Sequence, residues 1–339
     1  LQVRDQGHPA LFRGREFLWN EGHTAHVDFE DAERQVQVAV KIYRKVYDAL
    51  GLSYILLKRP DFDKFAGAVY TLAFDTWNPD GKTSQIGTVH NLGENFAKAF
   101  DVTYEDDEGS HRYVSNTCYG MGFGRTLAAT IAHHGDNNGL VLPPLVAPKQ
   151  VVIVPILFRG REGDVVAYSK EIEAKLKEAG IRTVLDDDDR LRPGEKYYKW
   201  DMYGVPLRVE VGPREAEART VTLVRRDNRA KSKASFDELV GVIQGLFEDL
   251  FADLKRRSRE RLESEMVDAH SLDELKSYME QRKIARVNWC GEPSCAFELK
   301  DQVAGEVRGT LWDESDEPTG PCMVCGDEAK YIAYVSQTY

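Results

Sequence analysis

The sequence has no run of about eighteen apolar residues, so no membrane-spanning helix is expected. It also lacks the charged and apolar segments of a secretory leader, which makes the cytoplasm the predicted compartment. Neither a glycine–lysine phosphate loop nor a local Ser/His/Asp or Cys/His nucleophile signature occurs. The residues that remain as candidates for a site are arginines, glycines, amides, hydroxyls and histidines in β-rich segments. This inventory suits a protein that binds a nucleotide and promotes attack at phosphorus by positioning and charge neutralisation.

Charge is unevenly distributed along the 339 residues. The formal net charge of −11 argues against non-specific binding of nucleic acid. Residues 190–233, however, contain twelve Lys or Arg and six Asp or Glu, a local net charge of +6. A basic pair of surface strands would give this pattern, and so would a selective RNA site on an otherwise acidic protein.

Cysteine is scarce, and four of the five cysteines fall into two late pairs. Cys290 and Cys295 are separated by four residues and Cys322 and Cys325 by two, whereas Cys118 stands apart. In a cytosolic protein this spacing favours zinc thiolates over disulfides, with free thiols or a lost site as the alternatives. Four thiolates leave no open coordination position, so we expect a structural Zn²⁺.

A glycine-rich segment lies between Asn116 and Pro144. Gly120, Gly122 and Gly124 lead into Arg125, and the helix-forming run TLAATIAHH follows. Glycines let a backbone approach a ligand closely, and a helix that begins after them directs free N–H groups toward a phosphate. The pattern alone is weak, because strands that precede helices often end in glycine.

The front half reads as strands and hairpins with one long helix. LFRGREFLWNEGHTAH predicts a strand pair; its crowded polar residues indicate a binding site or, alternatively, a salt-bridged sheet edge. A helix is expected from Asp28 or Asp31 to Gly51, then a strand over residues 52–57. The turn NPDGK and the turn at residues 107–109 each predict a hairpin.

The second half of the chain has a different residue pattern, in which buried strands alternate with helices. QVVIVPI predicts a buried strand, SKEIEAKLKEAG a helix and IRTVLDD a second strand, which together give a βαβ unit. DDRLRPGEKYYKWDMYG is expected to be a loop, followed by strands in VPLRVEVGP and RTVTLVRR and by a long helix from FDELVGVIQGLF onward. SLDELKSYMEQRK predicts a further helix. We therefore expect three domains, at 1–148, 149–255 and 256–339.

The whole chain resembles the prolyl-tRNA synthetases of the archaeal/eukaryotic type. The resemblance rests on strings in a shared order: REFLWNEGHTAH, KFAGAVY, GTVHNLGENFAKAF, HGDNNGLVLPP, VAPKQVVIVPI, PGEKYYKWDMYGVPLRVEVGPR and the four-cysteine module. It implies an α+β and α/β multidomain fold. The parts would be a class II catalytic domain on an antiparallel sheet, an α/β anticodon-binding domain and a C-terminal zinc-binding α+β domain.

The resemblance also implies which residues meet ATP. Arg13 would contact phosphate oxygens, Phe17 would stack under adenine, and Arg125 would close the stack and meet the γ-phosphate, so that Arg13 and Arg125 are the candidate catalytic residues. Gln85 and Thr88 would contact ATP and Mg²⁺. The full set implied for ATP is Arg4, Arg13, Gly14, Phe17, Gln85, Thr88 and Arg125.

Four residues would form the wall of a proline pocket: Trp19, His23, Phe65 and His90. In the family, the proline carboxylate attacks the α-phosphorus of ATP, and a terminal ribose hydroxyl of tRNA(Pro) then takes the prolyl group. Bases of the anticodon would stack on aromatics such as Tyr197, Tyr198 or Trp200, and the end of the chain at Tyr339 would fold back toward the catalytic domain. The intact protein would be a homodimer.

The chain departs from the family pattern in three places. The first class II motif and the loop that grips the imino group of proline lie upstream in the family, so we expect a missing N-terminal part and little activity from these 339 residues alone. Gln6 stands where the second motif has an acid, and CYGMGFGR replaces the usual Ser-Trp-Gly before Arg125. Two alternatives are a truncated or non-catalytic paralogue that acts as an RNA-binding zinc module, and a class II relative for another amino acid.

Overall fold

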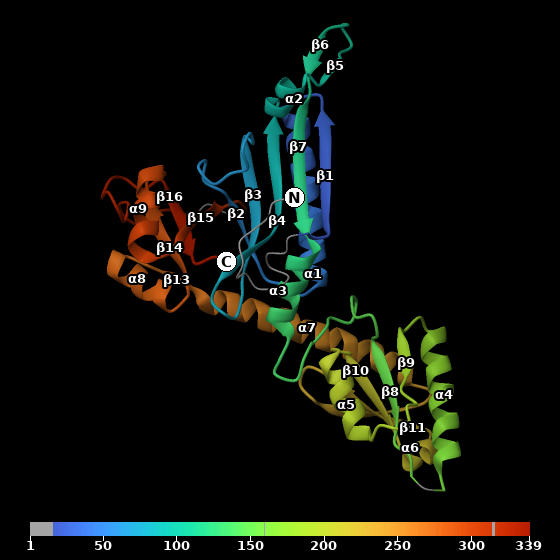
Figure 1. Ribbon diagram of the computed structural model, residues 1–339. Coiled ribbons are helices and arrows are strands. Elements are labelled where there is room, and N and C mark those ends of the chain that lie inside the picture. Colours follow the sequence, from blue (N-terminus) through green and yellow to red (C-terminus); the bar gives the residue numbers. More distant parts are fainter. Residues whose placement is uncertain (1–15, 159, 314–315) are drawn as a thin grey trace. The chain divides into compact units, whose positions relative to one another are not determined.

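The structure is a computed structural model that describes residues 16–158, 160–313 and 316–339 (Figure 1). These residues form two compact units. The first contains the chain up to Asp48, Leu52–Ala129 and Arg259–Tyr339; the second contains Ala49–Gly51 and Thr130–Ser258. Arg4, Arg13 and Gly14 lie outside the described residues.

Among the described residues of the first unit, nine strands form one sheet. Neighbouring strands are antiparallel except for the last pair, which is parallel. Their order is β1 (Trp19–His26), β7 (Ser115–Gly122), β4 (Thr83–Gly93), β3 (Tyr70–Trp77), β2 (Ile55–Lys58), β15 (Glu306–Leu311), β16 (Tyr331–Ser336), β14 (Ile284–Trp289) and β13 (Met266–Asp268). Strands from both ends of the chain therefore share one sheet.

Helix α1 (Phe29–Ala49) covers one face of this sheet at β1, β7 and β4 (Figure 1). It begins as predicted, because the side chain of Asp28 accepts a hydrogen bond from the backbone N–H of Asp31 at 2.7 Å. Tyr43 and Tyr47 are fully buried and pack their rings against Phe74 of β3. The opposite face of β1, β7, β4 and β3 remains available for a site.

Two hairpins confirm the turn predictions. The NPDGK turn joins β3 to β4. The second hairpin pairs β5 (Thr103–Glu105) with β6 (His111–Tyr113), after the short helix α2 (Asn95–Phe100). Helix α3 (Phe123–His134) begins at once after β7, so Gly124 and Arg125 lie in its first turn and do not precede it.

The C-terminal part of the first unit packs α8 (Leu272–Glu280) and α9 (Pro293–Val303) against β14–β16. Strand β15 pairs with β2, which connects these strands to the front of the sheet. Beyond β16, the chain end lies alongside β4: the Thr83 N–H donates to the carbonyl of Gln337 at 2.8 Å. The hydroxyl of Tyr339 donates to Asp80 at 2.8 Å.

The second unit is an α/β structure around a five-stranded sheet, counted over its described residues. The strand order is β12 (Lys231–Ser235), β11 (Thr220–Arg225), β10 (Leu207–Val211), β8 (Val151–Pro155) and β9 (Thr183–Leu185). Strand β8, which lies between β10 and β9, is fully buried, as its unbroken run of apolar residues predicts. The helices are α4 (Glu162–Glu178), α5 (Pro193–Met202), α6 (Pro213–Ala218) and α7 (Leu239–Glu265), whose last residues belong to the first unit.

The predicted loop over residues 188–204 is wrong in its middle, where α5 forms. Pro193 occupies the first turn of α5, where its missing N–H costs no hydrogen bond. The Glu195 side chain accepts a hydrogen bond from the backbone N–H of Arg192 at 2.7 Å and caps the helix. In the described part of the chain, no helix is both long enough and apolar enough to span a membrane.

Candidate active site and metal centre

A cavity of about 670 Å³ opens on the sheet face opposite α1. Its floor consists of residues from β1, β7, β4 and β3, and its rim comes from the segments that follow β2 and β4. The described residues that line it include Trp19, Glu21, His23, Arg59, Phe65, Thr71, Gln85, Thr88, His90, Phe96, Cys118 and Gly120. All of them belong to the first unit.

The strand register places four polar side chains in one row across the floor. His23 on β1 pairs with Cys118 on β7, Cys118 pairs with His90 on β4, and His90 pairs with Thr71 on β3. Because side chains alternate along a strand, Glu21 and Thr88 share this face with His23 and His90. The predicted His23, Thr88 and His90 thus lie around one cavity, together with Glu21 from the crowded polar segment. Thr71 and Cys118, which the sequence did not suggest, join them.

His90 is held in a neutral form. Its Nδ1 lies 2.9 Å from the hydroxyl of Thr71, and that hydroxyl accepts a hydrogen bond from the Phe65 N–H at 3.0 Å. Burial lowers the pKa of His90 to about 4, so the ring is uncharged near neutral pH. A neutral imidazole in the cavity can exchange a hydrogen bond with a small ligand without carrying a charge.

Aromatic rings enclose the same cavity. The ring of Phe65 lies 4.9 Å from His90 and stacks on Phe96 at 6.0 Å, measured between centroids. The ring of Trp19 passes close over Gly120: a Cβ atom there would lie 3.3 Å from the indole. Glycine at this position therefore leaves room for the ring. The four residues predicted for a proline pocket, Trp19, His23, Phe65 and His90, all line this cavity.

A smaller, more polar cavity of about 310 Å³ adjoins Gln85, which lines both. Its described lining residues are Thr83, Ser84, Gln85, Arg125, Glu306, Arg308, Thr338 and Tyr339. Arg125 donates from Nη1 to the backbone carbonyl of Gln85 at 2.9 Å. The predicted pair Gln85 and Arg125 is thus in contact, and two guanidinium groups and several hydroxyls surround the cavity.

A buried charge network supports Gln85 from the other side. Arg59 donates to the side-chain oxygen of Gln85 at 3.0 Å and makes two hydrogen bonds to Asp75, at 2.9 and 2.6 Å. Arg308 donates to the same carboxylate at 3.0 Å. Burial opposes ionisation of Asp75, but Arg308 and Arg59 together lower its pKa to about 2. Nothing in the sequence around residue 308 pointed to this role.

Phe17 lies apart from both cavities. Its ring is half exposed and meets Trp19 edge to face, with 5.8 Å between the centroids. It lines neither cavity among the described residues. The expected stack of Phe17 and Arg125 on one ligand remains a prediction.

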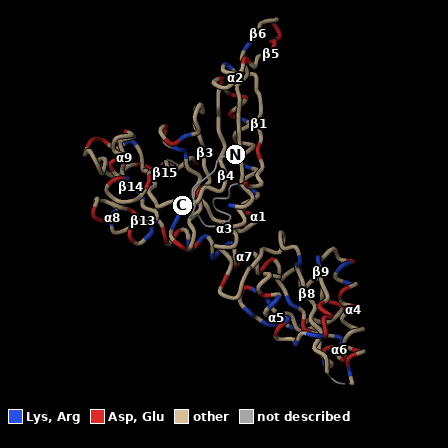
Figure 2. Tube along the Cα trace, in the orientation of Figure 1, with Lys and Arg blue, Asp and Glu red and all other residues tan. Residues whose placement is uncertain are grey.

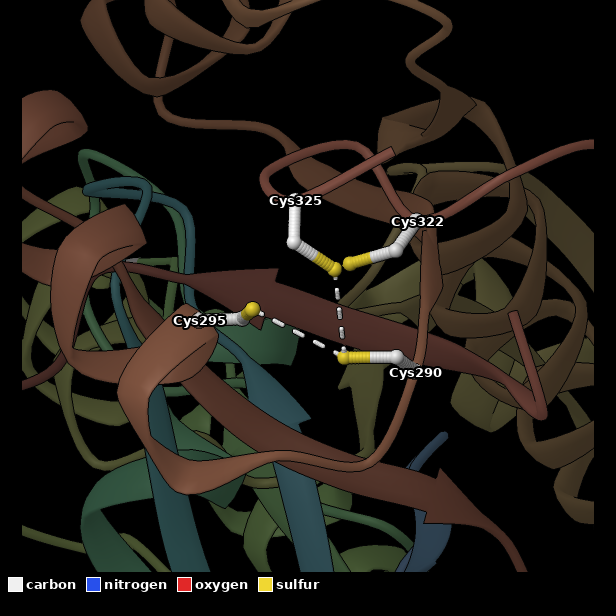
Figure 3. Close-up of side chains that lie close together, drawn as sticks. All are labelled: Cys290, Cys295, Cys322 and Cys325. Atoms are coloured by element: carbon white, nitrogen blue, oxygen red, sulfur yellow. Dashed lines mark hydrogen bonds between the residues drawn. The ribbon is translucent and has the colours of Figure 1, made fainter. Parts of the chain in front are cut away.

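The four late cysteines converge on one point (Figure 3). Cys290 follows β14, Cys295 lies in the first turn of α9, and Cys322 and Cys325 come from a tight turn. That turn is closed by the Gly326 N–H, which donates to the carbonyl of Cys322 at 3.0 Å, with φ of +77° at Gly326. All four sulfur atoms lie within 4.8 Å of one another.

The spacing of these sulfur atoms fits a single tetrahedral ion. Sulfur atoms that share one zinc at about 2.3 Å lie ~3.8 Å apart. The Sγ of Cys290 lies 3.6 Å from that of Cys295 and 3.8 Å from that of Cys325. Burial opposes ionisation of Cys322, but the backbone N–H groups of Cys325 and Val324 lower its pKa to about 7. The donor set is therefore suited to a metal ion that prefers thiolates.

Ion pairs engage most of the basic residues of the stretch 190–233 in the second unit. Acidic residues also lie close to this stretch in the chain, as the red segments beside the blue ones around α5 and α6 show (Figure 2). Nine of the twelve described Lys and Arg residues in this stretch form ion pairs: Arg190, Lys196, Lys199, Arg208, Arg219, Arg225, Arg226, Arg229 and Lys231. The charge available for an RNA ligand is therefore smaller than the sequence count of +6 indicates.

The aromatic residues of α5 differ in their freedom to stack on a base. Tyr198 is 70% exposed. Tyr197 lies under the guanidinium of Arg208, at 3.9 Å from its ring centroid, and Trp200 donates from its indole nitrogen to Asp186 at 2.6 Å. Of the three predicted stacking residues, Tyr198 is thus the most accessible.

Three family models match successive parts of the chain. A class II tRNA synthetase core domain (G, H, P, S and T) matches residues 4–134. An anticodon binding domain matches 150–246, and the C-terminal domain of prolyl-tRNA synthetase matches 272–339.

Individual relatives extend over nearly the whole chain. The proline–tRNA ligase of Pyrococcus horikoshii is 47% identical over 97% of this chain and 69% of its own length. That of Methanopyrus kandleri is 44% identical, over 97% of this chain and 67% of its own. The crystal structure of Cryptosporidium parvum prolyl-tRNA synthetase with L-proline and AMP is 34% identical, with a TM-score of 0.93, and covers 99% of this chain and 72% of that one.

Proposed function

The chain belongs to the prolyl-tRNA synthetase family, and on this premise we propose that it activates proline with ATP and transfers it to tRNA(Pro). A carboxylate oxygen of proline attacks the α-phosphorus, and the bond to the β-phosphate oxygen breaks with release of pyrophosphate. A terminal ribose hydroxyl of the tRNA then attacks the prolyl carbonyl, and AMP leaves. The aromatic cavity around neutral His90 is the observation that supports this proposal most directly.

We assign proline to the larger cavity. Trp19 and Phe65 would pack against the pyrrolidine ring, and His90, held by Thr71, would orient a polar group of the substrate. His23 would complete the wall. Because His90 is uncharged, it adds no repulsion toward the secondary ammonium of proline.

We assign the ATP phosphates to the region bordered by Gln85 and Arg125. Both side chains line the smaller cavity, and Arg125 is a planar cation suited to oxyanions. Arg13 and Arg125 are the proposed catalytic residues, and Arg4, Gly14, Phe17 and Thr88 complete the proposed ATP set. A Mg²⁺ ion held near Gln85 and Thr88 would neutralise charge that develops on the phosphates.

We propose that Zn²⁺ occupies the four-cysteine cluster. The sulfur spacing fits tetrahedral thiolate ligation, and four thiolates would leave no open coordination position for a substrate. Three of the four cysteines are buried in the core formed by α8, α9 and β14–β16. Zinc would therefore stabilise this core and take no part in the reaction.

We further propose a division into a catalytic part (1–148), a part that reads the anticodon (149–255) and a zinc part (256–339). The family models match inside each of these ranges, and the anticodon-domain match supports tRNA as the partner. We also propose a cytoplasmic location and a homodimer, the latter as an inference from the family.

The test is proline-dependent exchange of labelled pyrophosphate into ATP by the full-length protein. We expect exchange with proline and none with other amino acids at equal concentration. Replacing His90 by Leu should raise the KM for proline at least about tenfold, because the proposed buried hydrogen bond between the imidazole and the substrate is lost. His111→Gln, on the distant β6 hairpin, is the matched control. Exchange that is absent, or equal with another amino acid, would contradict the proposal and favour a non-catalytic RNA-binding protein.

A further inference from the structure

Three metal-binding side chains meet at one corner of the larger cavity. Glu21 and His23 are two residues apart on β1 and project to the same face, and Cys118 is the register partner of His23 on β7. One donor atom from each of the three residues lies within 4.8 Å of the other two. They form a carboxylate–imidazole–thiol set, separate from the four-cysteine cluster.

The distances suit a shared cation. The Nε2 of His23 lies 3.1 Å from Oε1 of Glu21 and 3.9 Å from Sγ of Cys118. Ligands bound to one zinc at about 2.0–2.3 Å lie roughly 3.3–3.6 Å apart in a tetrahedron. Both separations are within a small side-chain rotation of that value. A donor set of one sulfur, one nitrogen and one oxygen is also typical of zinc, whereas Mg²⁺ and Ca²⁺ prefer oxygen.

Three protein ligands would leave a fourth position open, and that position faces the cavity, because all three residues line it. An ion there would carry two positive charges into the space assigned to proline. It would displace the thiol proton of Cys118 and repel the secondary ammonium of the substrate.

We propose that Glu21, His23 and Cys118 form a second, reversible site for Zn²⁺, and that zinc bound there excludes proline from its pocket. The ion acts as an inhibitor that competes with proline. ATP, assigned to the side of the cavity near Gln85, is affected less. This competition rests on the proposed function, whereas the binding site itself does not.

The first test measures binding without any assay of activity. Co²⁺ is titrated into full-length protein whose four-cysteine cluster is filled with zinc, and the cobalt–thiolate absorption band is recorded. We expect one additional Co²⁺ per chain, with a band that disappears in Cys118→Ser. His23→Asn and Glu21→Gln should each weaken binding at least about tenfold. His111→Asn, an exposed histidine outside the cavity, should bind as the unchanged protein does.

Two results would overturn the site. One is the absence of a thiolate band in the unchanged protein; the other is a band that persists in Cys118→Ser, which would assign it to exchange at the four-cysteine cluster. His23 is 63% exposed, so His23→Asn provides a second test if Cys118→Ser does not fold.

The second test measures competition. In the exchange assay, Zn²⁺ should raise the apparent KM for proline and leave kcat unchanged, and Glu21→Gln should need about tenfold more zinc for the same effect. Inhibition that proline cannot relieve, or that is equal in Glu21→Gln, would refute the competition. A protein that binds Co²⁺ as expected but shows no exchange would keep the metal site and reject the proposed function.

Discussion

Replacing Arg308 by Gln should weaken ATP binding from a position far away in sequence. Arg308 is mostly buried and donates to Asp75 at 3.0 Å; Asp75 holds Arg59, and Arg59 holds the side chain of Gln85. The backbone carbonyl of Arg308, which accepts from Arg59 at 2.6 Å, is unaffected by the substitution. The change therefore removes the hydrogen bond to Asp75 and the longer contact to Glu306 at 3.5 Å, and leaves the contacts among Arg59, Asp75 and Gln85 in place.

The magnitude follows from the bonds involved. A hydrogen bond to a charged group contributes about 1.5–3 kcal/mol, so the free energy of unfolding should fall by roughly 2 kcal/mol. The loss of a cation that lines the cavity assigned to the phosphates, together with looser positioning of Arg59, should weaken ATP binding by about 1 kcal/mol. This corresponds to roughly a fivefold rise in the KM for ATP. The KM for proline should change little, because no residue of this network holds His90.

The assay is pyrophosphate exchange by the full-length protein, with ATP and proline varied separately and with urea unfolding alongside. Arg286→Gln is the matched control: it removes an exposed ion pair to Asp268 in the same part of the chain and should cost less than about 1 kcal/mol, with no change in either KM. A fall in stability with an unchanged KM for ATP, or a parallel rise in both KM values, would refute the reasoning.

Three further substitutions or conditions give separate expectations. Gly87→Ala should destabilise the protein by about 1–3 kcal/mol in urea unfolding, because its Cβ would lie 2.3 Å from the hydroxyl of buried Tyr47; Gly122→Ala, with no described atom within 4 Å, should be nearly neutral. The pKa of Asp75 is about 2 in the folded protein, against an ordinary value of 3.8. This lowered pKa should contribute about 2.5 kcal/mol to the free energy of unfolding above pH ~4, and the contribution should be lost as the pH falls toward 2. Urea unfolding measured across this pH range would reveal the loss. Tyr198→Ala should weaken tRNA binding by about 1–3 kcal/mol in a filter-binding assay while proline-dependent exchange is unchanged.

The sequence predicted those helix ends and turns that are determined by residues next to them in the chain. Asp28 and Gly51 mark the two ends of α1, and the NPDGK turn marks the β3–β4 hairpin. The cysteine spacing predicted a cluster that the structure brings together. Helix α5 was missed because Pro193 and Gly194 indicate a loop when taken alone, although proline is also favoured in the first turn of a helix. Distinguishing the two requires knowing what the segment packs against.

Partners distant in sequence could not be predicted in the same way. Asp75 and Arg308 are 233 positions apart, and they meet only because β15 pairs with β2 beside β3. No periodicity or spacing near either residue encodes that pairing. The charge network that supports Gln85 is therefore a consequence of the sheet order, which local patterns do not determine.

The row of residues across the cavity depends on a single irregularity. The hairpin turn pairs Trp77 with Thr83, and regular continuation of that register would place Thr71 opposite Val89. A bulge between Phe74 and Asp75 shifts the pairing by one residue and brings Thr71 opposite His90 instead. A one-residue shift reverses which side chains share a face, so the hydrogen bond between Thr71 and His90 exists only because of the bulge. His90 could be predicted as a site residue from the sequence, but its pairing with Thr71 could be found only in the folded sheet.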